Sequence, residues 1–367
     1  MRKDTKCAFL IAVMALLLSG CGKESVATTE GNTDKATTEV SFEEKTEAKE
    51  EDLTVAEITE TSITETSSEE ITEAEITEDS IPFSDSIQIE LSEDKASTTF
   101  AAFDTVVSMT IYGADAENIL KEAADITDKI DKVFNTLRED SDVASVNKSE
   151  SVSNTSDIFN NGANIAKEYK ESTNGDFDIS IKGGENQFDT IEFGKGYAGK
   201  ELLTYLLTKE EGELSAGLIS MGGNITAIGS KPDGKPWKVG IQDPDKPQGE
   251  YLAVIKIEGL ISGETMTIAT GGIYGENTGG RNVINPHTGE KAESDIISAT
   301  VVSSDPIDAA VISKALVVKG YDKAVEFWRS GNYDFEMILI DSDRRIIITE
   351  GMKDNFSSDI TPEILTK

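Results

Sequence analysis

Three turn-forming segments between residues 220 and 289 constrain the fold of this chain more than any other feature. They read S-M-G-G-N at 220–224, Q-D-P at 242–244 and N-P-H-T-G at 285–289, and they interrupt stretches in which apolar and polar residues alternate. Alternation with a period of two is typical of β-strands, and Gly, Asn and Pro are common in tight turns. The region therefore predicts short strands joined by turns. Turns of this kind also bring backbone N–H groups close together, as a site for a phosphate-bearing ligand requires.

Segments with helical periodicity flank this strand-rich region on both sides. We expect helices at 114–137, 158–171, 195–209, 306–318 and 321–329, and strands at 105–112, 218–228, 237–242, 252–257, 265–269, 297–303, 335–340 and 345–349. A Gly-rich loop follows the sequence F-D-I-S-I at 177–181. Helices that cluster between runs of antiparallel-looking strands indicate an α+β fold rather than a regular parallel α/β sheet.

The N-terminus has the pattern of an export signal. Three basic residues precede the apolar run 8–18, which is too short to span a bilayer, and L-L-S-G-C ends the segment at Cys21. The L-x-G-C ending resembles a bacterial lipobox, in which the Cys becomes the lipidated first residue of the mature protein. An ordinary signal peptide followed by an unrelated Cys is the alternative. We therefore expect residues 1–20 to be removed and Cys21 to anchor the protein at the extracytoplasmic face of the cell membrane.

The segment after the signal is acidic and poor in apolar residues. Residues 24–80 contain 19 Asp and Glu against 3 Lys, a composition that cannot bury a core, so we expect a disordered, extended tether. A partner-binding acidic tail is the alternative. We assign residues 21–97 to this linker and 98–367 to the folded domain. Residues 81–367 keep a net charge of −22 out of −35 for the chain, which disfavours nucleic acid and anionic headgroups as ligands.

Cysteine and histidine usage excludes several kinds of site. Cys7 leaves with the signal and Cys21 is acylated, so the folded part has no disulfide, Cys nucleophile or thiolate metal site. His287 is the single histidine, which excludes H-E-x-x-H and any other site that needs two. A Ser-His-Asp triad would have to use His287, although its position in a turn is typical of a solvent-facing loop residue. The sequence has neither a G-x-S-x-G elbow nor a P-loop.

Four motifs carry a resemblance to a known family. They read F-D-T-V-V-S-M-T at 103–110, F-N-T-L-R-E-D-S at 134–141, G-D-F-D-I-S-I at 175–181 and F-D-T-I-E-F-G-K-G-Y-A at 188–198. In this order, and with S-M-G-G-N downstream, they resemble the FAD:protein FMN transferases, the ApbE-type flavin transferases. The resemblance spans residues 99–350. It implies ApbE-like, T-fold-type mixed sheets with flanking helices, which agrees with the α+β class expected from the order of elements.

The resemblance also implies a function, a cofactor and partners. Members of this family move FMN from FAD to a Thr hydroxyl of an acceptor protein, here expected to be an extracytoplasmic redox protein, with FAD as the substrate and Mg²⁺ as the metal. Contact with the membrane is expected through the lipid anchor alone. In this register Asp189 accepts a hydrogen bond from the flavin, and Lys195 approaches the cofactor from the first turn of a helix. The implied cofactor-binding residues are Phe103, Leu137, Phe177, Asp178, Asp189, Lys195 and Ile284.

The chain departs from the family pattern at the metal and base positions. Glu192, through its main chain, and Ser313 keep metal-binding positions, but Ala310 and Lys314 replace the Asp and Thr that bind Mg²⁺ in the family. Because Mg²⁺ requires a set of hard oxygen ligands, we expect its binding to be weak or lost. Asn282 replaces the family His, and an amide cannot act as a general base near neutral pH. The catalytic residue is therefore unknown.

These departures leave alternatives open. Lys314 either neutralises a phosphate or pyrophosphate in place of the metal or lies on the helix surface. Asp308 is either a displaced metal ligand or a first-turn residue that favours the helix dipole. The region 181–194 is also much shorter than in the family. The alternative function is a non-catalytic ApbE-like lipoprotein that binds flavin, a nucleotide or a protein partner, whereas a generic solute-binding lipoprotein is disfavoured because repeated βαβ units are missing.

Overall fold

A mixed sheet of ten strands forms the centre of the part of the chain that the computed structural model describes, namely residues 82–149, 151–152, 155–180, 188–210, 212–261, 263–275 and 280–367. The strand order is β1-β2-β3-β4-β5-β8-β11-β12-β13-β15. Neighbouring strands are antiparallel except β13 and β15, which are parallel. The strands are β1 (Ile89–Ser92), β2 (Lys95–Ala102), β3 (Thr105–Tyr112), β4 (Ala216–Met221), β5 (Asn224–Ile228), β8 (Thr265–Gly272), β11 (Ile296–Ser303), β12 (Glu336–Asp341), β13 (Ile346–Thr349) and β15 (Glu363–Leu365).

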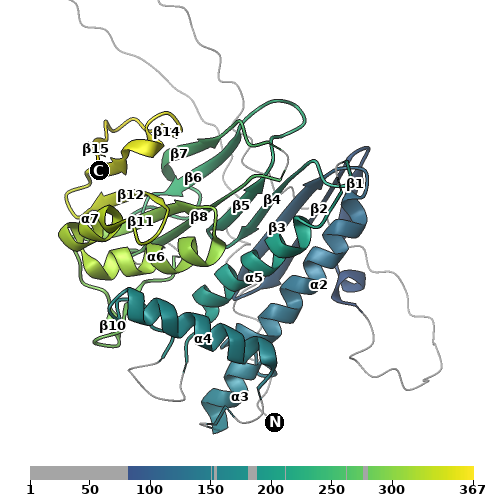
Figure 1. Cartoon of the computed structure of the whole chain (residues 1–367), viewed down its shortest axis with the longest axis horizontal. Helices are drawn as coiled ribbons and strands as arrows, with labels where there is room; N and C mark the ends of the chain where they lie inside the picture. The colour runs from purple at the N-terminus through teal and green to yellow at the C-terminus, as the bar shows by residue number, and fades with distance from the viewer. Residues whose placement is uncertain are drawn as a thin grey trace, which may run out of the picture. The chain divides into compact units, whose positions relative to one another are not determined.

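Helices cover one face of this sheet (Figure 1). Helix α2 contacts β2 and β3, while α6 contacts β5, β8 and β11. The helices are α2 (Ala116–Phe134), α3 (Asp142–Ser149), α4 (Asp157–Ser172), α5 (Ile191–Leu206), α6 (Pro306–Lys319) and α7 (Tyr321–Ser330), with short 3₁₀ turns η2 (Phe83–Ser86) and η4 (Glu350–Met352). A small sheet consists of β6 (Trp237–Gln242), β7 (Tyr251–Ile257) and β14 (Phe356–Ser357), and a two-stranded ribbon of β9 (Ile284–Asn285) and β10 (Glu290–Lys291).

Alternation along the central strands separates two cores on opposite faces of the large sheet. In β12, Met337 and Leu339 pack with residues of α6 and α7. The intervening Ile338 and Ile340 pack with Trp237 of the small sheet. Because successive side chains of a strand point to opposite faces, the helices cover one face and the small sheet covers the other. The mixed α+β arrangement expected from the sequence is confirmed.

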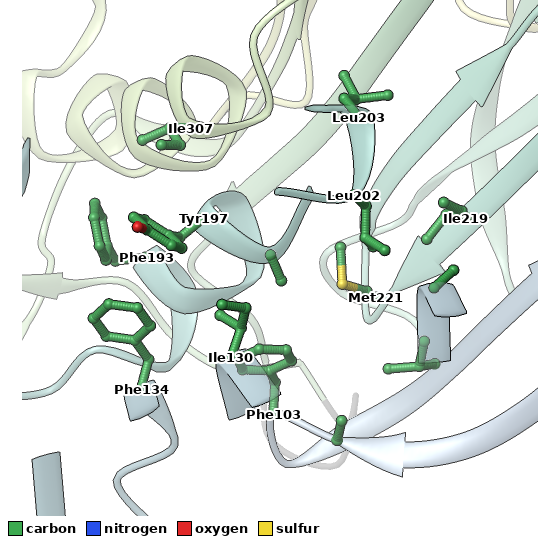
Figure 2. Close-up of a cluster of buried hydrophobic side chains, with 14 of the residues drawn as sticks. Phe103, Ile130, Phe134, Phe193, Tyr197, Leu202, Leu203, Ile219, Met221 and Ile307 are labelled. Carbon is green, nitrogen blue, oxygen red and sulfur yellow. The ribbon is translucent and has the colours of Figure 1, made fainter. Parts of the chain in front are cut away.

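An aromatic core holds the start of α5 against α2. Phe134 of α2 contacts Phe193 and Tyr197 of α5, with ring centroids 5.6 and 5.1 Å apart (Figure 2). Gly194 makes this packing possible, because a Cβ atom there would lie 2.7 Å from the Cβ of Phe134. The hydroxyl of Thr190, directly before α5, donates to the carbonyl of Phe134 at 2.6 Å. The position of the first turn of α5 therefore depends on this core.

Two expected element boundaries are wrong. The expected strand 218–228 is a hairpin of β4 and β5, because Gly222 and Gly223 adopt φ values of +55° and +96°, a region that favours glycine and allows a tight turn. The helix expected at 195–209 begins at Ile191. Lys195 therefore lies in the second turn of α5 rather than the first, and the first turn presents Glu192.

The predicted boundary between linker and domain at residue 98 is also too late. Phe83 packs edge-on against Phe100 with ring centroids 5.1 Å apart, and β1 pairs with β2. The carboxylate of Asp125 on α2 accepts hydrogen bonds from the backbone and hydroxyl of Ser84. Tertiary contacts thus order residues whose polar composition resembles that of the linker. The folded part begins before Phe83.

The predicted signal peptide, Cys21 and linker residues up to 81 lie outside the described residues. The lipid anchor and the tether therefore stay predictions. Among the helices in the described ranges, none is long and apolar enough to cross a membrane.

Candidate functional site

Helices α5 and α6 meet along a seam of small residues. A Cβ atom on Gly196 would lie 2.7 Å from the Cβ of Ala310, and one on Gly199 would lie 2.8 Å from the Cβ of Pro306. The pairing runs in opposite directions along the two helices, so they are antiparallel. Because residues four positions apart share a helix face, the next pair along the seam is Glu192 with Lys314. Their side chains form an ion pair, with Lys314 Nζ 3.3 Å from Glu192 Oε2.

Two buried ammonium groups share the carboxylate of Glu192. Lys195 Nζ lies 2.8 Å from Oε1, and the side chains of Lys195 and Lys314 are 6% and 12% exposed. Lys314 also donates to the carbonyl of Thr270 at 3.4 Å. The backbone of β8 approaches closely here, because a Cβ atom on Gly271 would lie 2.8 Å from the carbonyl oxygen of Ser313. We call Glu192, Lys195 and Lys314 the seam cluster.

A second ion pair lies near the seam cluster. Arg281 contacts Asp189, with 2.7 Å between Nη2 and Oδ2, and both side chains are exposed. The charge of Arg281 also lowers the pKa of both Glu192 and Lys314. Asp189 and Lys195, which the sequence analysis assigns to flavin binding, thus lie at the same end of α5.

The pKa values of the seam cluster reflect burial and unequal charge. Burial opposes ionisation of Glu192, but Lys314 and Lys195 outweigh it and lower its pKa to about 2. Burial lowers the pKa of Lys314, the attraction of Glu192 opposes this, and repulsion from Lys195 adds to it. Burial and the negative charge of Glu192 raise the pKa of Tyr274 to about 12. The ionised form of Glu192 is therefore stabilised, whereas the attraction of Glu192 only partly offsets the effect of burial on Lys314.

Glu192 should contribute to the pH dependence of stability. A carboxylate whose pKa is lowered on folding stabilises the protein above its unfolded pKa of 4.5, and this contribution disappears as the pH falls through about 2. Glu192→Gln should therefore reduce the loss of unfolding free energy between pH 6 and pH 2.5 by up to about 3 kcal/mol. Urea unfolding at several pH values measures this. Asp178 and Asp243 titrate in both proteins, so their contribution to the loss of unfolding free energy at low pH cancels in the comparison. A variant that loses as much unfolding free energy as the wild type would therefore contradict the lowered pKa of Glu192.

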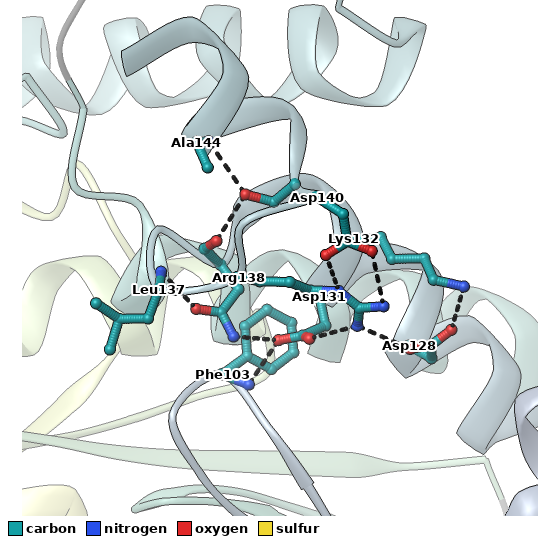
Figure 3. A network of polar contacts seen from close by, with 10 residues as sticks. Phe103, Asp128, Asp131, Lys132, Leu137, Arg138, Asp140 and Ala144 are labelled. Carbon is teal, nitrogen blue, oxygen red and sulfur yellow. Dashed lines mark hydrogen bonds and ion pairs between the residues drawn. The ribbon is translucent and has the colours of Figure 1, made fainter. Parts of the chain in front are cut away.

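Phe103 and Leu137, which are also assigned to flavin binding, differ sharply in burial. Phe103 is fully buried, and its backbone N–H donates to the Asp131 carboxylate at 2.6 Å, within a network that includes Arg138 (Figure 3). Its φ of +52° is a strained value for a non-glycine residue, which this network and the packing against Gly194 maintain. Leu137 is 65% exposed and points away from the network (Figure 3).

The remaining positions have identifiable contacts. Phe177 is buried, with its ring centroid 6.5 Å from that of Phe193. Asp178 pairs with Lys170 at 2.6 Å; burial opposes its ionisation, but this partner lowers its pKa. Ile284 is exposed on β9. Their assignment to flavin binding stays a prediction.

Residues at or near the family metal and base positions have structural partners. The side-chain oxygen of Asn282 accepts a hydrogen bond from the backbone N–H of Tyr274 at 2.7 Å, so it connects the residues just after β8 to those just before β9. The hydroxyl of Ser313 donates to the carbonyl of Ala310 within α6. Asp308 accepts a hydrogen bond from the hydroxyl of Tyr169 at 2.5 Å. Asp308 is therefore a contact between α4 and α6.

His287 is exposed but not isolated. Its Nε2 lies 2.9 Å from Oδ1 of Asp176, whose other oxygen contacts the buried Nζ of Lys319 at 2.7 Å. The ring also covers Gly175, where a Cβ atom would lie 3.1 Å from the imidazole Cε1. Within the described residues, His287 thus joins the β9–β10 turn to the segment after α4.

The seam cluster does not fit Mg²⁺. In the described part of the chain no three His, Cys, Asp or Glu side chains form a group that could hold a metal ion. Ala310 supplies no ligand, and Lys314 places an ammonium beside the one carboxylate of the seam cluster. Mg²⁺ requires several oxygen ligands in octahedral geometry. The expectation that Mg²⁺ binding is weak or lost stays a prediction.

Sequence reasoning missed two features of the site. It treated Glu192 as a main-chain ligand, although its carboxylate organises both lysines. It also gave no role to Arg281. The role of the Glu192 carboxylate had one signal in the sequence. Glu192 and Gly196 are four residues apart, as are Ala310 and Lys314. No local pattern in the sequence pointed to the role of Arg281.

Comparisons with known proteins agree with this fold and these motifs. Residues 103–189 and 182–339 match the model of the ApbE family. The FAD:protein FMN transferase of Escherichia coli K12 is 33% identical over 160 residues, which cover 42% of this chain and 43% of that protein. The FAD:protein FMN transferase of Treponema pallidum is 28% identical over 181 residues, covering 46% and 47%. The chain thus aligns with less than half the length of these curated relatives.

Solved structures show the same architecture. The apo form of the flavinyl transferase ApbE of Pseudomonas stutzeri has a TM-score of 0.56 at 18% sequence identity, over 75% of this chain and 98% of that one. The ApbE protein of Thermotoga maritima has a TM-score of 0.58 at 18% identity, over 73% and 99%. At this identity the likeness shows the fold. Because the family model also matches well over half of the sequence, the protein belongs to the ApbE family.

Proposed function

We propose that the protein is an FAD:protein FMN transferase. The observation that carries the proposal is the F-D-T-I-E-F-G-K-G-Y-A segment, which the fold places at the start of α5 with Asp189 and the buried Lys195 at one end of the helix. Curated relatives of this chain bear the name FAD:protein FMN transferase. In the reaction, a Thr hydroxyl oxygen of the acceptor bonds to the FMN phosphorus of FAD. The bond from that phosphorus to the bridging oxygen breaks, AMP leaves, and the hydroxyl proton passes to solvent.

The described residues supply binding and orientation for this reaction. Asp189 accepts a hydrogen bond from the flavin, and Lys195 faces its phosphates from the second turn of α5. The first-turn N–H groups of α5 favour an anion at the same place. Leu137 and Ile284, both exposed, offer apolar surface to the isoalloxazine ring. No step is assigned to a metal, because the residues present do not fit one.

A second candidate function is flavin binding without transfer. It is favoured by Ala310 and Lys314, which remove the metal ligands, and by Asn282, whose side chain holds a loop in place of the family His. Such a protein would retain the ApbE fold as a binding module for flavin, a nucleotide or a protein partner. The proposed cellular setting is the same for both candidates. The mature protein is anchored through Cys21 at the extracytoplasmic face, and an acceptor would be an extracytoplasmic redox protein.

Intact-mass measurement distinguishes the two candidates. The full-length protein is incubated with FAD, Mg²⁺ and an acceptor that carries a Thr flavinylation site. Transferase function predicts an FMN adduct on the acceptor. FAD retention without an adduct would favour the binding module, and absence of both would contradict the flavin assignment.

A pair of matched variants tests the site. Asp189→Ala should weaken FAD binding by roughly tenfold or more, as expected for losing a hydrogen bond that is donated to a charged group. Asp233→Ala removes the same charge from an exposed turn and should leave FAD binding unchanged. Fluorescence titration of FAD measures both. Equal affinities for the two variants would exclude Asp189 as a flavin contact.

A further inference from the structure

We propose that Lys314 is a built-in cation of the ligand site, so that the protein binds a pyrophosphate group through its own ammonium groups and needs no divalent metal. This inference rests on the proposed flavin function for the identity of the ligand. It concerns how the phosphates are recognised.

Positive charge exceeds negative charge at the end of the α5–α6 seam. Lys195, Lys314 and Arg281 contribute three positive charges, and Glu192 and Asp189 contribute two negative charges. Arg281 and Asp189 neutralise each other, so two ammonium groups share one carboxylate. Among the described residues neither lysine has a second carboxylate within ion-pair distance. This local positive excess stands out in a domain whose net charge is strongly negative, and it favours an anionic ligand.

The two positive charges of the seam cluster are also buried. Both lysine side chains are mostly removed from solvent, and a buried charge without a full counter-charge is costly. A bound phosphate would compensate the second positive charge.

Lys314 and the first turn of α5 also have hydrogen-bond donors that are poorly used. An ammonium has three donors. The two acceptors of Lys314, Glu192 and the Thr270 carbonyl, lie at the long distances of 3.3 and 3.4 Å. Thr190, the N-cap residue of α5, makes no side-chain cap, because its hydroxyl donates to Phe134 instead. The first-turn amides of α5 and both ammonium groups can therefore contribute donors to one anion.

The competing account is that the lysines only neutralise Glu192 and lock the two helices together. Under that account the seam cluster is already complete and an added anion gains nothing. Substitution of Glu192 separates the two accounts, because it removes the resident anion. If the ammonium groups serve an incoming anion, removing the carboxylate that competes for them should strengthen anion binding.

Calorimetry with inorganic pyrophosphate in EDTA tests the proposal on the full-length protein. We expect binding without metal and a loss of affinity of about tenfold or more in Lys314→Met. Lys200→Met, which removes an exposed lysine of α5, should bind within roughly twofold of the wild type. Glu192→Gln should bind at least about threefold more tightly, and this variant decides the question if Lys314→Met fails to fold. Thermal unfolding confirms that each variant is folded.

The outcomes separate this inference from the proposed function. Absence of pyrophosphate binding in EDTA would overturn the inference, and so would affinity unchanged in both Lys314→Met and Glu192→Gln. FAD binding or FMN transfer that requires Mg²⁺ would then leave the proposed function intact. Metal-free pyrophosphate binding that depends on Lys314, without any binding of FAD, would support the cation site and remove the flavin assignment.

Discussion

The Phe134→Ala variant is expected to lose about 4 kcal/mol of unfolding free energy, the range observed when a fully buried aromatic ring is truncated. Phe134 has no exposed surface and contacts the rings of Phe159, Phe193 and Tyr197. Gly162 and Gly194 have no side chain that could fill the resulting cavity. The substitution also removes the packing that positions the first turn of α5. We therefore expect the variant to lose FAD affinity as well as stability.

Thermal and urea unfolding measure this effect. For a domain of this size the expected loss corresponds to a fall in Tm of roughly 8–16 °C. Phe327→Ala is a control, because this partly buried ring packs against Tyr333 and Phe335 and belongs to a different hydrophobic cluster from Phe134. It should cost clearly less stability and leave FAD affinity unchanged. Equal losses in the two variants would contradict the role assigned to the Phe134 core.

The double variant Ala310→Asp with Lys314→Thr is expected to make FAD binding dependent on Mg²⁺. The α5–α6 seam places position 310 beside Gly196 and position 314 beside Glu192. The substitutions would place a carboxylate and a hydroxyl beside the Glu192 carboxylate. They would also remove the ammonium group of Lys314. Without metal, the two carboxylates repel each other and lack a buried counter-charge. With Mg²⁺, the same oxygens become ligands.

Calorimetry of FAD in EDTA and in Mg²⁺ measures the gain. The double variant should bind FAD at least about tenfold more tightly with Mg²⁺ than with EDTA, and its Tm should rise with Mg²⁺ concentration. The single variant Lys314→Thr lacks the new carboxylate and should show weak binding that Mg²⁺ does not restore. A double variant indifferent to Mg²⁺ would show that α6 does not present these positions to the ligand.

Much of the fold could be predicted because the hydrophobic pattern of most elements is local. Strands β3 and β6 coincide with their expected ranges, since apolar and polar residues alternate along them and turns bound them. The start of α5 was misplaced by four residues. Ile191 and Phe193 look like part of a loop in the sequence, and their packing against α2 makes them helical. Strands β1 and β2 were both missed, although Ile87, Ile89 and Leu91 alternate with polar residues, because the expected linker was extended over this segment up to residue 97.

The candidate site was predicted less completely than the fold. Family motifs pointed to Asp189, Lys195 and Lys314, and the structure brings all three to one end of the α5–α6 seam. The role of Glu192 depends on the crossing of two helices that are more than a hundred residues apart in the sequence. Periodicity within one helix cannot reveal such a crossing. The same reason explains why Arg281, from the loop after β8, was not associated with Asp189.

We propose that this ApbE-family protein binds FAD at the start of α5 through ammonium groups rather than a metal. The most direct measurement is the ³¹P NMR spectrum of FAD with the full-length protein in EDTA. We expect both phosphorus resonances to shift or broaden with the wild type and to return to their free positions with Lys314→Met. If a metal were required, the FAD resonances would respond only after Mg²⁺ is added. Resonances that stay unchanged with the wild type in EDTA and respond to Mg²⁺ would therefore contradict metal-free binding.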